Sequence, residues 1–218
     1  MIKAILFDMD GVLFDTERLY RAVMRKAMAE QNAVMSDEVF ARMLGSNETE
    51  SMRIMREAYP CVDYTRLTGR RIGRARQYIR RFGVPVKKGV PGVLHDLVSQ
   101  NYQIGLATST ERDETDYLLA RSGLSGLFGA EVCGKEAARG KPAPDSYLLC
   151  AKKLGVHPNE CAGVEDSLNG LKALHAAGIY AVMIPDIMSY SDVFRPYADA
   201  VIDDLTGLSD VINRIQCL

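Results

Sequence analysis

Cysteine and histidine are scarce in this chain of 218 residues, and neither is spaced as a metal ligand. The five cysteines are odd in number and form no CxxC pair, and the three histidines lie in predicted helices or loops without ligand spacing. This pattern is typical of reduced thiols in a cytoplasm and of structural histidines. A chain of this length buries roughly 70% of its unfolded surface, so it needs no disulfide or structural metal for stability.

Long apolar runs and an excess of one charge are also missing. No stretch approaches the ~18 residues that a membrane span requires, and Asp8 interrupts the first apolar run too early for a signal peptide. A net charge of −1 argues against bulk attraction to nucleic acid or anionic membranes. We therefore expect a soluble cytoplasmic protein, a monomer by default, with no nucleic-acid or membrane partner.

The chain does contain short apolar runs rich in β-branched residues, at 4–7, 104–108, 130–134, 161–165, 181–185 and 200–203. Each run is nearly continuous, as expected of strands that are covered on both faces. Helical patterns separate the later runs, and three of them close on Gly123, Gly155 and Gly178. This alternation predicts an α/β fold with a doubly wound parallel sheet.

Residues 16–86 break the alternation, because they contain no convincing strand and several helical patterns. Thr16 is a candidate cap for the first helix, and Ile72, Ala75, Ile79 and Phe82 form an apolar stripe on the last one. Six methionines between positions 24 and 55 are expected to fill a core. The pattern predicts an all-helical cap domain at 16–86, inserted into an α/β core domain of residues 1–15 and 87–218.

Polar residues gather at the predicted strand ends, where ligands bind in an open parallel sheet. Asp8 and Asp10 follow the first strand, Thr108 and Ser109 end the second, Lys141 lies in the loop after the third, and Glu165 and Asp166 end the fourth. Two like charges about 4 Å apart cost on the order of 4 kcal/mol at an effective dielectric near 20. Four carboxylates in one place therefore require a cation, and an all-oxygen ligand set suits Mg²⁺ together with a phosphoryl group.

Four segments in order carry a resemblance to a known family: DMDGV at 8–12, LATS at 106–109, GKPAPD at 140–145 and GVEDS at 163–167. Over essentially its whole length the chain resembles the haloacid dehalogenase superfamily of phosphotransferases. The position of the helical insert is similar to the subgroup that contains β-phosphoglucomutase and many small-metabolite phosphatases. The resemblance implies a three-layer core whose first strand lies between the second and the fourth.

The resemblance also implies a role for each matching residue. Asp8 would be the nucleophile that forms an aspartyl phosphate, and Asp10 would be the general acid and base, with its backbone carbonyl on the metal. Thr108, the backbone N–H of Ser109 and Lys141 would hold the phosphoryl oxygens. The Mg²⁺ ligands would be Asp8, Asp10, Glu165 and Asp166. Thr16 matches a hinge residue of the β-phosphoglucomutase type.

Simpler interpretations compete with each of these assignments. The Asp8–Asp10 segment is also typical of a solvated turn. Glu165 and Asp166 could serve only to cap a helix, and Lys141 could be an ordinary surface lysine. Asp203 and Asp204 form another acidic pair, for which surface charge and helix capping are the favoured explanation. In the arginine-rich stretch 66–81, Arg66, Arg70, Arg74 and Arg81 are expected on a solvated face, whereas Arg71 and Arg76 flank the apolar stripe and can reach the cleft.

The favoured function is a Mg²⁺-dependent phosphatase of a small phosphorylated metabolite, with a sugar phosphate as the favoured substrate. The alternative is a hexose-phosphate mutase, against which three departures count: Tyr20 stands where the mutase type has a histidine, Asn47 where it has an arginine, and Glu17 is more typical of phosphatases. A third hypothesis is a catalytically idle binding or regulatory protein on the same fold.

Overall fold

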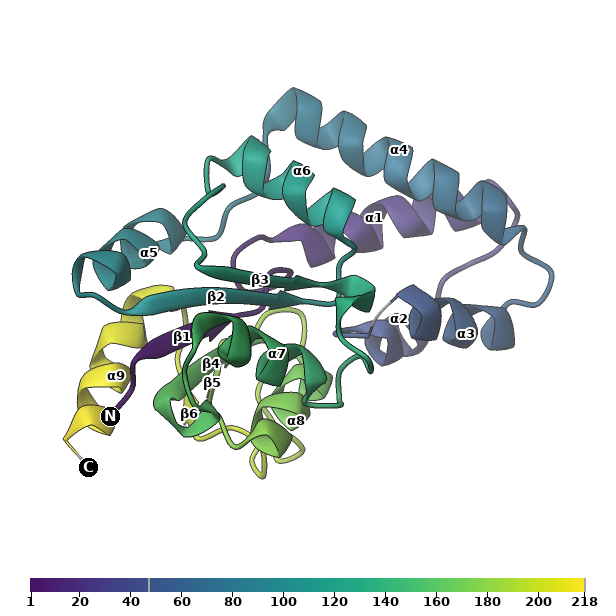
Figure 1. The fold of residues 1–218 in the computed structure, drawn as a ribbon. Helices are drawn as coiled ribbons and strands as arrows, with labels where there is room; N and C mark the ends of the chain where they lie inside the picture. The colour runs from purple at the N-terminus through teal and green to yellow at the C-terminus, as the bar shows by residue number, and fades with distance from the viewer. Residues whose placement is uncertain (47, 218) are drawn as a thin grey trace.

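The computed structural model describes residues 1–46 and 48–217, and six strands form one parallel sheet in the order β3-β2-β1-β4-β5-β6 (Figure 1). The strands are β1 Ala4–Phe7, β2 Gln103–Thr108, β3 Ala130–Cys133, β4 Cys161–Glu165, β5 Tyr180–Met183 and β6 Ala200–Val201. The order confirms that the first strand lies between the second and the fourth. The predicted α/β fold with a doubly wound parallel sheet is therefore confirmed.

Helices cover both faces of this sheet and make the core three layers deep. They are α5 Val90–Ser99, α6 Arg112–Ser122, α7 Asp145–Leu154, α8 Leu168–Ala177 and α9 Leu208–Gln216. Ile5 and Phe7 of β1 face a core shared with α5, α6 and α9, whereas Leu6 faces the other core, shared with α7 and α8. This alternation of side chains along β1 explains why its run is apolar without a break.

Four further helices lie between β1 and α5: α1 Thr16–Ala29, α2 Asp37–Met43, α3 Glu48–Ala58 and α4 Tyr64–Phe82. The described residues of this block contain no strand, and they enclose a separate apolar core. Figure 1 shows α4 above α6 and α1, with α2 and α3 beside the sheet. We call α1–α4 the cap helices; the division of the chain at residues 16 and 86 remains a prediction.

The two chain segments that join the cap helices to the sheet are hydrogen-bonded to each other. The Asp15 N–H donates to the Pro85 carbonyl (2.7 Å), and the Lys87 N–H donates to the Leu13 carbonyl (2.9 Å). The Lys87 ammonium contacts the Gly11 carbonyl and Asp186, at 2.5 and 2.8 Å. The base of the cap helices is thereby tied to the loop that carries Asp10.

The sequence predicts the ends of three helices correctly but not the end of the last strand. Gly123, Gly155 and Gly178 end their helices with φ near +70°, as predicted. The last strand, in contrast, stops at Val201, and Asp204 accepts a hydrogen bond from the Thr206 N–H at the start of a short 3₁₀ helix. Helix capping is therefore confirmed for Asp204.

Two predictions about the cap helices need correction. Thr16 does not cap α1, because it is the first helical residue and its hydroxyl donates to the Asp10 carboxylate. The apolar stripe of α4 is buried at Ala75 and Ile79 only, whereas Ile72 is 37% and Phe82 65% exposed. The two ends of the apolar stripe are therefore exposed, and only its middle is buried. Across the described parts of the chain, no helix combines the length and apolarity needed to cross a membrane.

Candidate active site

The first predicted catalytic residue, Asp8, lies directly after β1 and is buried against a lysine. The Lys141 ammonium donates to Asp8 Oδ1 (2.5 Å), to Glu165 Oε1 (2.7 Å) and to the Ala107 carbonyl (2.9 Å). It also lies 4.7 Å from the centre of the Tyr147 ring. The loop after β3 thus brings one fixed positive charge to the ends of β1, β2 and β4. A solvated surface lysine is excluded for Lys141, whose side chain is 2% exposed.

Glu165 is surrounded by hydrogen-bond donors on both oxygens. Oε1 accepts from Lys141 and from the Tyr147 hydroxyl (2.7 Å), and Oε2 accepts from the backbone of Asp166 and from Ser167. These bonds fix the loop that follows β4 and hold Lys141 in place. Tyr147 was not predicted from the sequence, although its position on the buried face of α7 follows from helical periodicity.

Three carboxylates lie close enough to share a cation. Oxygen atoms of Asp8, Glu165 and Asp166 lie within 4.8 Å of one another, and all three residues are buried. No described residue donates a hydrogen bond to the Asp166 side chain, which packs against Gly11 so closely that a Cβ there would lie 2.1 Å from Oδ2. One ammonium facing three carboxylates leaves a negative site of oxygen ligands, which fits a hard divalent cation such as Mg²⁺.

The pKa values reflect the same crowding. Burial, and then the charges of Glu165 and Asp10, raise the pKa of Asp8 to about 8, although Lys141 acts in the opposite direction. Burial and the neighbouring carboxylates also raise the pKa of Asp166 well above its ordinary value. A bound divalent cation would favour the ionised form of both groups, so the protonation of the cluster is coupled to metal binding.

The Asp10 carboxylate lies outside this cluster and has partners of its own. It accepts hydrogen bonds from the hydroxyls of Thr16 and Thr110, the latter at 2.6 Å. Burial raises its pKa above the ordinary value, while these two hydroxyls act in the opposite direction. The predicted metal contact of Asp10 uses its backbone carbonyl, which leaves the carboxylate free for proton transfer. Both roles of Asp10 remain predictions.

Thr108 and Ser109 lie at the end of β2, beside the carboxylates. The Thr108 hydroxyl accepts from the Thr110 N–H (3.1 Å), and the Ser109 hydroxyl donates to the Gly45 carbonyl (3.3 Å) of the loop between α2 and α3. Both residues line the same cavity as Asp8. The structure therefore brings together all the predicted site residues, and Thr16 joins them through its hydrogen bond to Asp10. Their roles in binding remain predictions.

The cap helices cover this site and leave a cavity of about 370 Å³ between themselves and the sheet. Asn169, at the start of α8, donates to the Leu44 carbonyl (3.3 Å) and to Ser46 (3.4 Å), and Arg76 of α4 forms an ion pair with Glu114 of α6 (2.8 Å). The predicted replacement at Asn47 lies outside the described residues. These contacts hold the cap helices closed over the carboxylates.

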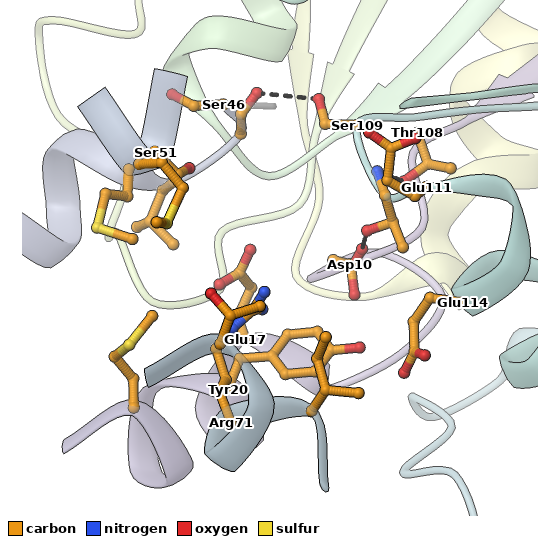
Figure 2. Close-up of a pocket in the computed structure, with 18 of the residues that line it drawn as sticks. Asp10, Glu17, Tyr20, Ser46, Ser51, Arg71, Thr108, Ser109, Glu111 and Glu114 are labelled. Atoms are coloured by element: carbon orange, nitrogen blue, oxygen red, sulfur yellow. Dashed lines mark hydrogen bonds between the residues drawn. The ribbon is translucent and has the colours of Figure 1, made fainter. Parts of the chain in front are cut away.

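Polar cap residues enter the cavity next to the carboxylates of Asp8, Asp10 and Asp166. Figure 2 shows Glu17, Tyr20 and Arg71 together, facing Asp10 across the cavity. The Arg71 guanidinium lies 6.0 Å from the centre of the Tyr20 ring, and burial raises the pKa of Glu17 to about 8. The Tyr20 hydroxyl is buried without a hydrogen-bond partner among the described residues. Arg71 and Arg76 both line the cavity, which confirms that they reach the cleft.

Comparisons with known proteins agree with this geometry. The chain is 32% identical to a phosphorylated carbohydrates phosphatase from Thermotoga maritima, with 82% of each chain covered. It is 31% identical to a β-phosphoglucomutase from Bacillus subtilis, over 83% of this chain and 82% of that protein. A crystal structure of β-phosphoglucomutase from Clostridium difficile shares the fold, with a TM-score of 0.83, 24% identity, and 98% and 96% of the two chains covered.

A family model described as haloacid dehalogenase-like hydrolase matches residues 2–178. That range includes the cap helices and every residue of the site described above. The chain therefore belongs to the haloacid dehalogenase-like hydrolases.

Proposed function

We propose that this chain is a Mg²⁺-dependent phosphatase that acts on a small phosphorylated metabolite of the sugar phosphate class. One observation carries the proposal: Lys141 bridges Asp8 and Glu165, and Asp8 and Asp166 line a cavity that the cap helices cover. The positive charge of Lys141 can stabilise the negative oxygens of a phosphoryl group, and the neighbouring Asp8 carboxylate can accept that group. The similarity to a phosphatase of phosphorylated carbohydrates supports the same conclusion.

In the first step an Asp8 carboxylate oxygen attacks phosphorus, and the bond between phosphorus and the ester oxygen breaks. Lys141 orients Asp8, since its ammonium donates to Oδ1, and it offsets the negative charge that develops on the phosphoryl oxygens. Asp10 gives its proton to the leaving alcohol, and its raised pKa makes the protonated form available for this task. The product is an aspartyl phosphate and a free alcohol.

In the second step water attacks the aspartyl phosphate. Asp10 now takes a proton from that water, and the bond between phosphorus and the Asp8 oxygen breaks, which regenerates both carboxyl groups. Mg²⁺ would be held by Asp8, Asp166 and the Asp10 carbonyl, with Glu165 alongside, and would supply positive charge to the phosphoryl oxygens. The Thr16 and Thr110 hydroxyls hold the Asp10 carboxylate in position between the two steps.

Residues 16–86 would act as the cap domain that selects the substrate. Sugar hydroxyls need hydrogen-bond partners in a closed cavity, and Glu17, Tyr20 and Arg71 supply polar groups next to Asp10. The unpartnered Tyr20 hydroxyl is the group that gains most from a sugar hydroxyl, because it is buried without a partner among the described residues. Thr16 would serve as the hinge, since it links the start of α1 to Asp10.

A hexose-phosphate mutase is the second candidate, favoured by the similarity to β-phosphoglucomutase and by the closed cap helices. A mutase passes the phosphoryl group to a second sugar hydroxyl and excludes water, whereas a phosphatase passes it to water. Incubation with a panel of sugar phosphates and Mg²⁺ distinguishes the two by free phosphate or an isomerised sugar phosphate. No turnover of any member would contradict both and favour a binding protein.

A further inference from the structure

The cavity above the catalytic carboxylates has two chemically different ends. The end formed by the sheet carries Asp8, Asp10 and Asp166 with the hydroxyls of residues 108–110. The end formed by the cap helices is lined mostly by apolar side chains, among them Met24, Phe40, Met43, Met52, Leu67 and Ile72, together with the polar side chains of Ser46, Ser51, Thr68 and Arg76. In Figure 2 the yellow sulfur atoms lie on the side of Ser51, away from Asp10.

Some of these apolar side chains face the cavity instead of filling the core of the cap helices. Met24, Met28, Met35 and Met55 belong to that core, as the sequence predicts for the cap methionines. Met52 is outside it and half-buried, and Ile72 is 37% exposed although it lies on the apolar stripe of α4. Ile79 of the same stripe belongs to the core shared with β1, α5 and α6, so the stripe runs from that core to the wall of the cavity.

A substrate fixed by its phosphate at Asp8 must extend toward this wall. Hydroxyls close to the phosphate meet Glu17, Tyr20 and Arg71, whereas hydroxyls placed against Met52 and Ile72 gain no hydrogen-bond partner from those two side chains. An apolar group at the same place gains free energy in proportion to the area that it buries. A simple polyhydroxylated sugar thus leaves the apolar side chains of the lining without a matching apolar group.

We propose that the substrate is a sugar phosphate that bears an apolar or aromatic substituent on the part remote from the phosphate. This inference rests on the proposed function and names the substrate class of the same site. The phosphate meets the carboxylate end, the sugar meets the polar residues of α1 and α4, and the substituent contacts Met52 and Ile72.

The test compares methyl β-glucoside 6-phosphate with phenyl β-glucoside 6-phosphate, which share the leaving hydroxyl and differ only in the remote substituent. Release of free phosphate is measured at saturating Mg²⁺. We expect kcat/KM to be at least about tenfold higher for the phenyl compound, mainly through a lower KM, because the ring gains buried apolar area. Equal values, or a preference for the methyl compound, would overturn the inference and leave the proposed function intact.

A pair of matched variants locates the effect in the cavity wall. Ile72→Thr places a hydroxyl on the wall, and Val34→Thr makes a comparable change at a cap position that is 87% exposed and outside the cavity lining. We expect Ile72→Thr to reduce the preference for the phenyl compound several-fold and Val34→Thr to leave it unchanged. The same reduction in both variants would contradict the assignment of the wall.

Binding to the Asp8→Asn variant tests the inference without turnover. Titration calorimetry with both glycosides should show tighter binding of the phenyl compound and a more negative heat-capacity change. This result would sustain the substrate class even if hydrolysis were absent and the proposed function failed. Equal affinity of the two compounds, or binding of neither, would refute the substrate class.

Discussion

We expect closure of the cap helices to depend on Gly45, so Gly45→Ala should impair turnover more than stability. Gly45 lies in the loop between α2 and α3 with φ of +70°, and its carbonyl accepts the Ser109 hydroxyl. A Cβ at this position would lie 2.3 Å from the Ser167 hydroxyl oxygen and 2.8 Å from the Ser167 Cβ. The added methyl group therefore clashes with the start of α8 while the cap helices are closed.

The size of the effect follows from how firmly Ser167 is held. Its hydroxyl donates to Glu165 Oε2 and accepts from the Gly170 N–H, both at 3.0 Å, and rotation would break both hydrogen bonds at about 1 kcal/mol each. Opening of the cap helices relieves the clash instead. We expect the closed state to lose about 2 kcal/mol relative to the open one, which lowers kcat/KM by about 30-fold.

The matched control for this variant is Gly123→Ala, because Gly123 has φ of +75° with no atom within 4 Å of an added Cβ. Both variants carry the backbone strain of a left-handed alanine, about 1–2 kcal/mol, and should lower the thermal midpoint alike. Only Gly45→Ala should lower kcat/KM in a phosphate-release assay. Equal activity of the two variants would refute the closure contact at Ser167.

Three further outcomes follow from the site. Asp10→Asn should slow turnover by about 10²–10⁴-fold, the usual contribution of a general acid and base, and normal phosphate release by this variant would contradict that role. EDTA should silence the enzyme and added Mg²⁺ restore it; activity in metal-free buffer would argue against a cation at Asp8 and Asp166. In EDTA the thermal midpoint should fall as the pH rises from 6 to 9, because the folded-state pKa of Asp8 is raised to about 8 by burial, above an unfolded value near 3.9. Stability linked to this group is complete below the unfolded pKa and is lost as the pH rises through 8, and Mg²⁺ should offset the loss. A midpoint independent of pH over this range, or one that rises, would contradict the raised pKa of the buried Asp8 carboxyl.

The sheet and the positions of the carboxylates were predictable from sequence, because both follow from local rules. Continuous apolar runs mark buried strands, and parallel strands place their carboxyl ends at one edge, so Asp8, Thr108 and Asp166 had to meet. The residues that orient them were harder to predict. Tyr147 contacts Glu165 from the first turn of α7, and nothing in its local sequence distinguishes this contact from ordinary core packing.

The cap helices show the limit of periodicity more clearly. An apolar stripe predicts which face of α4 turns inward, but it does not predict whether that face meets a packed core or a cavity. Ile79 packs in the core shared with β1, α5 and α6, whereas Ile72 lines the cavity. The orientation of Thr16 was unpredictable for a similar reason, since its partner Asp10 belongs to the loop before the helix.

The most direct measurement is the site of phosphorylation during turnover. The enzyme is mixed with Mg²⁺ and a sugar phosphate that it hydrolyses, quenched in acid and digested, and the peptides are analysed by mass spectrometry, with Asp8→Asn as the control. The account predicts a phosphoryl group on the peptide that contains Asp8 and none in the variant. A phosphoryl group on another residue, or full hydrolysis by the Asp8→Asn variant, would contradict it.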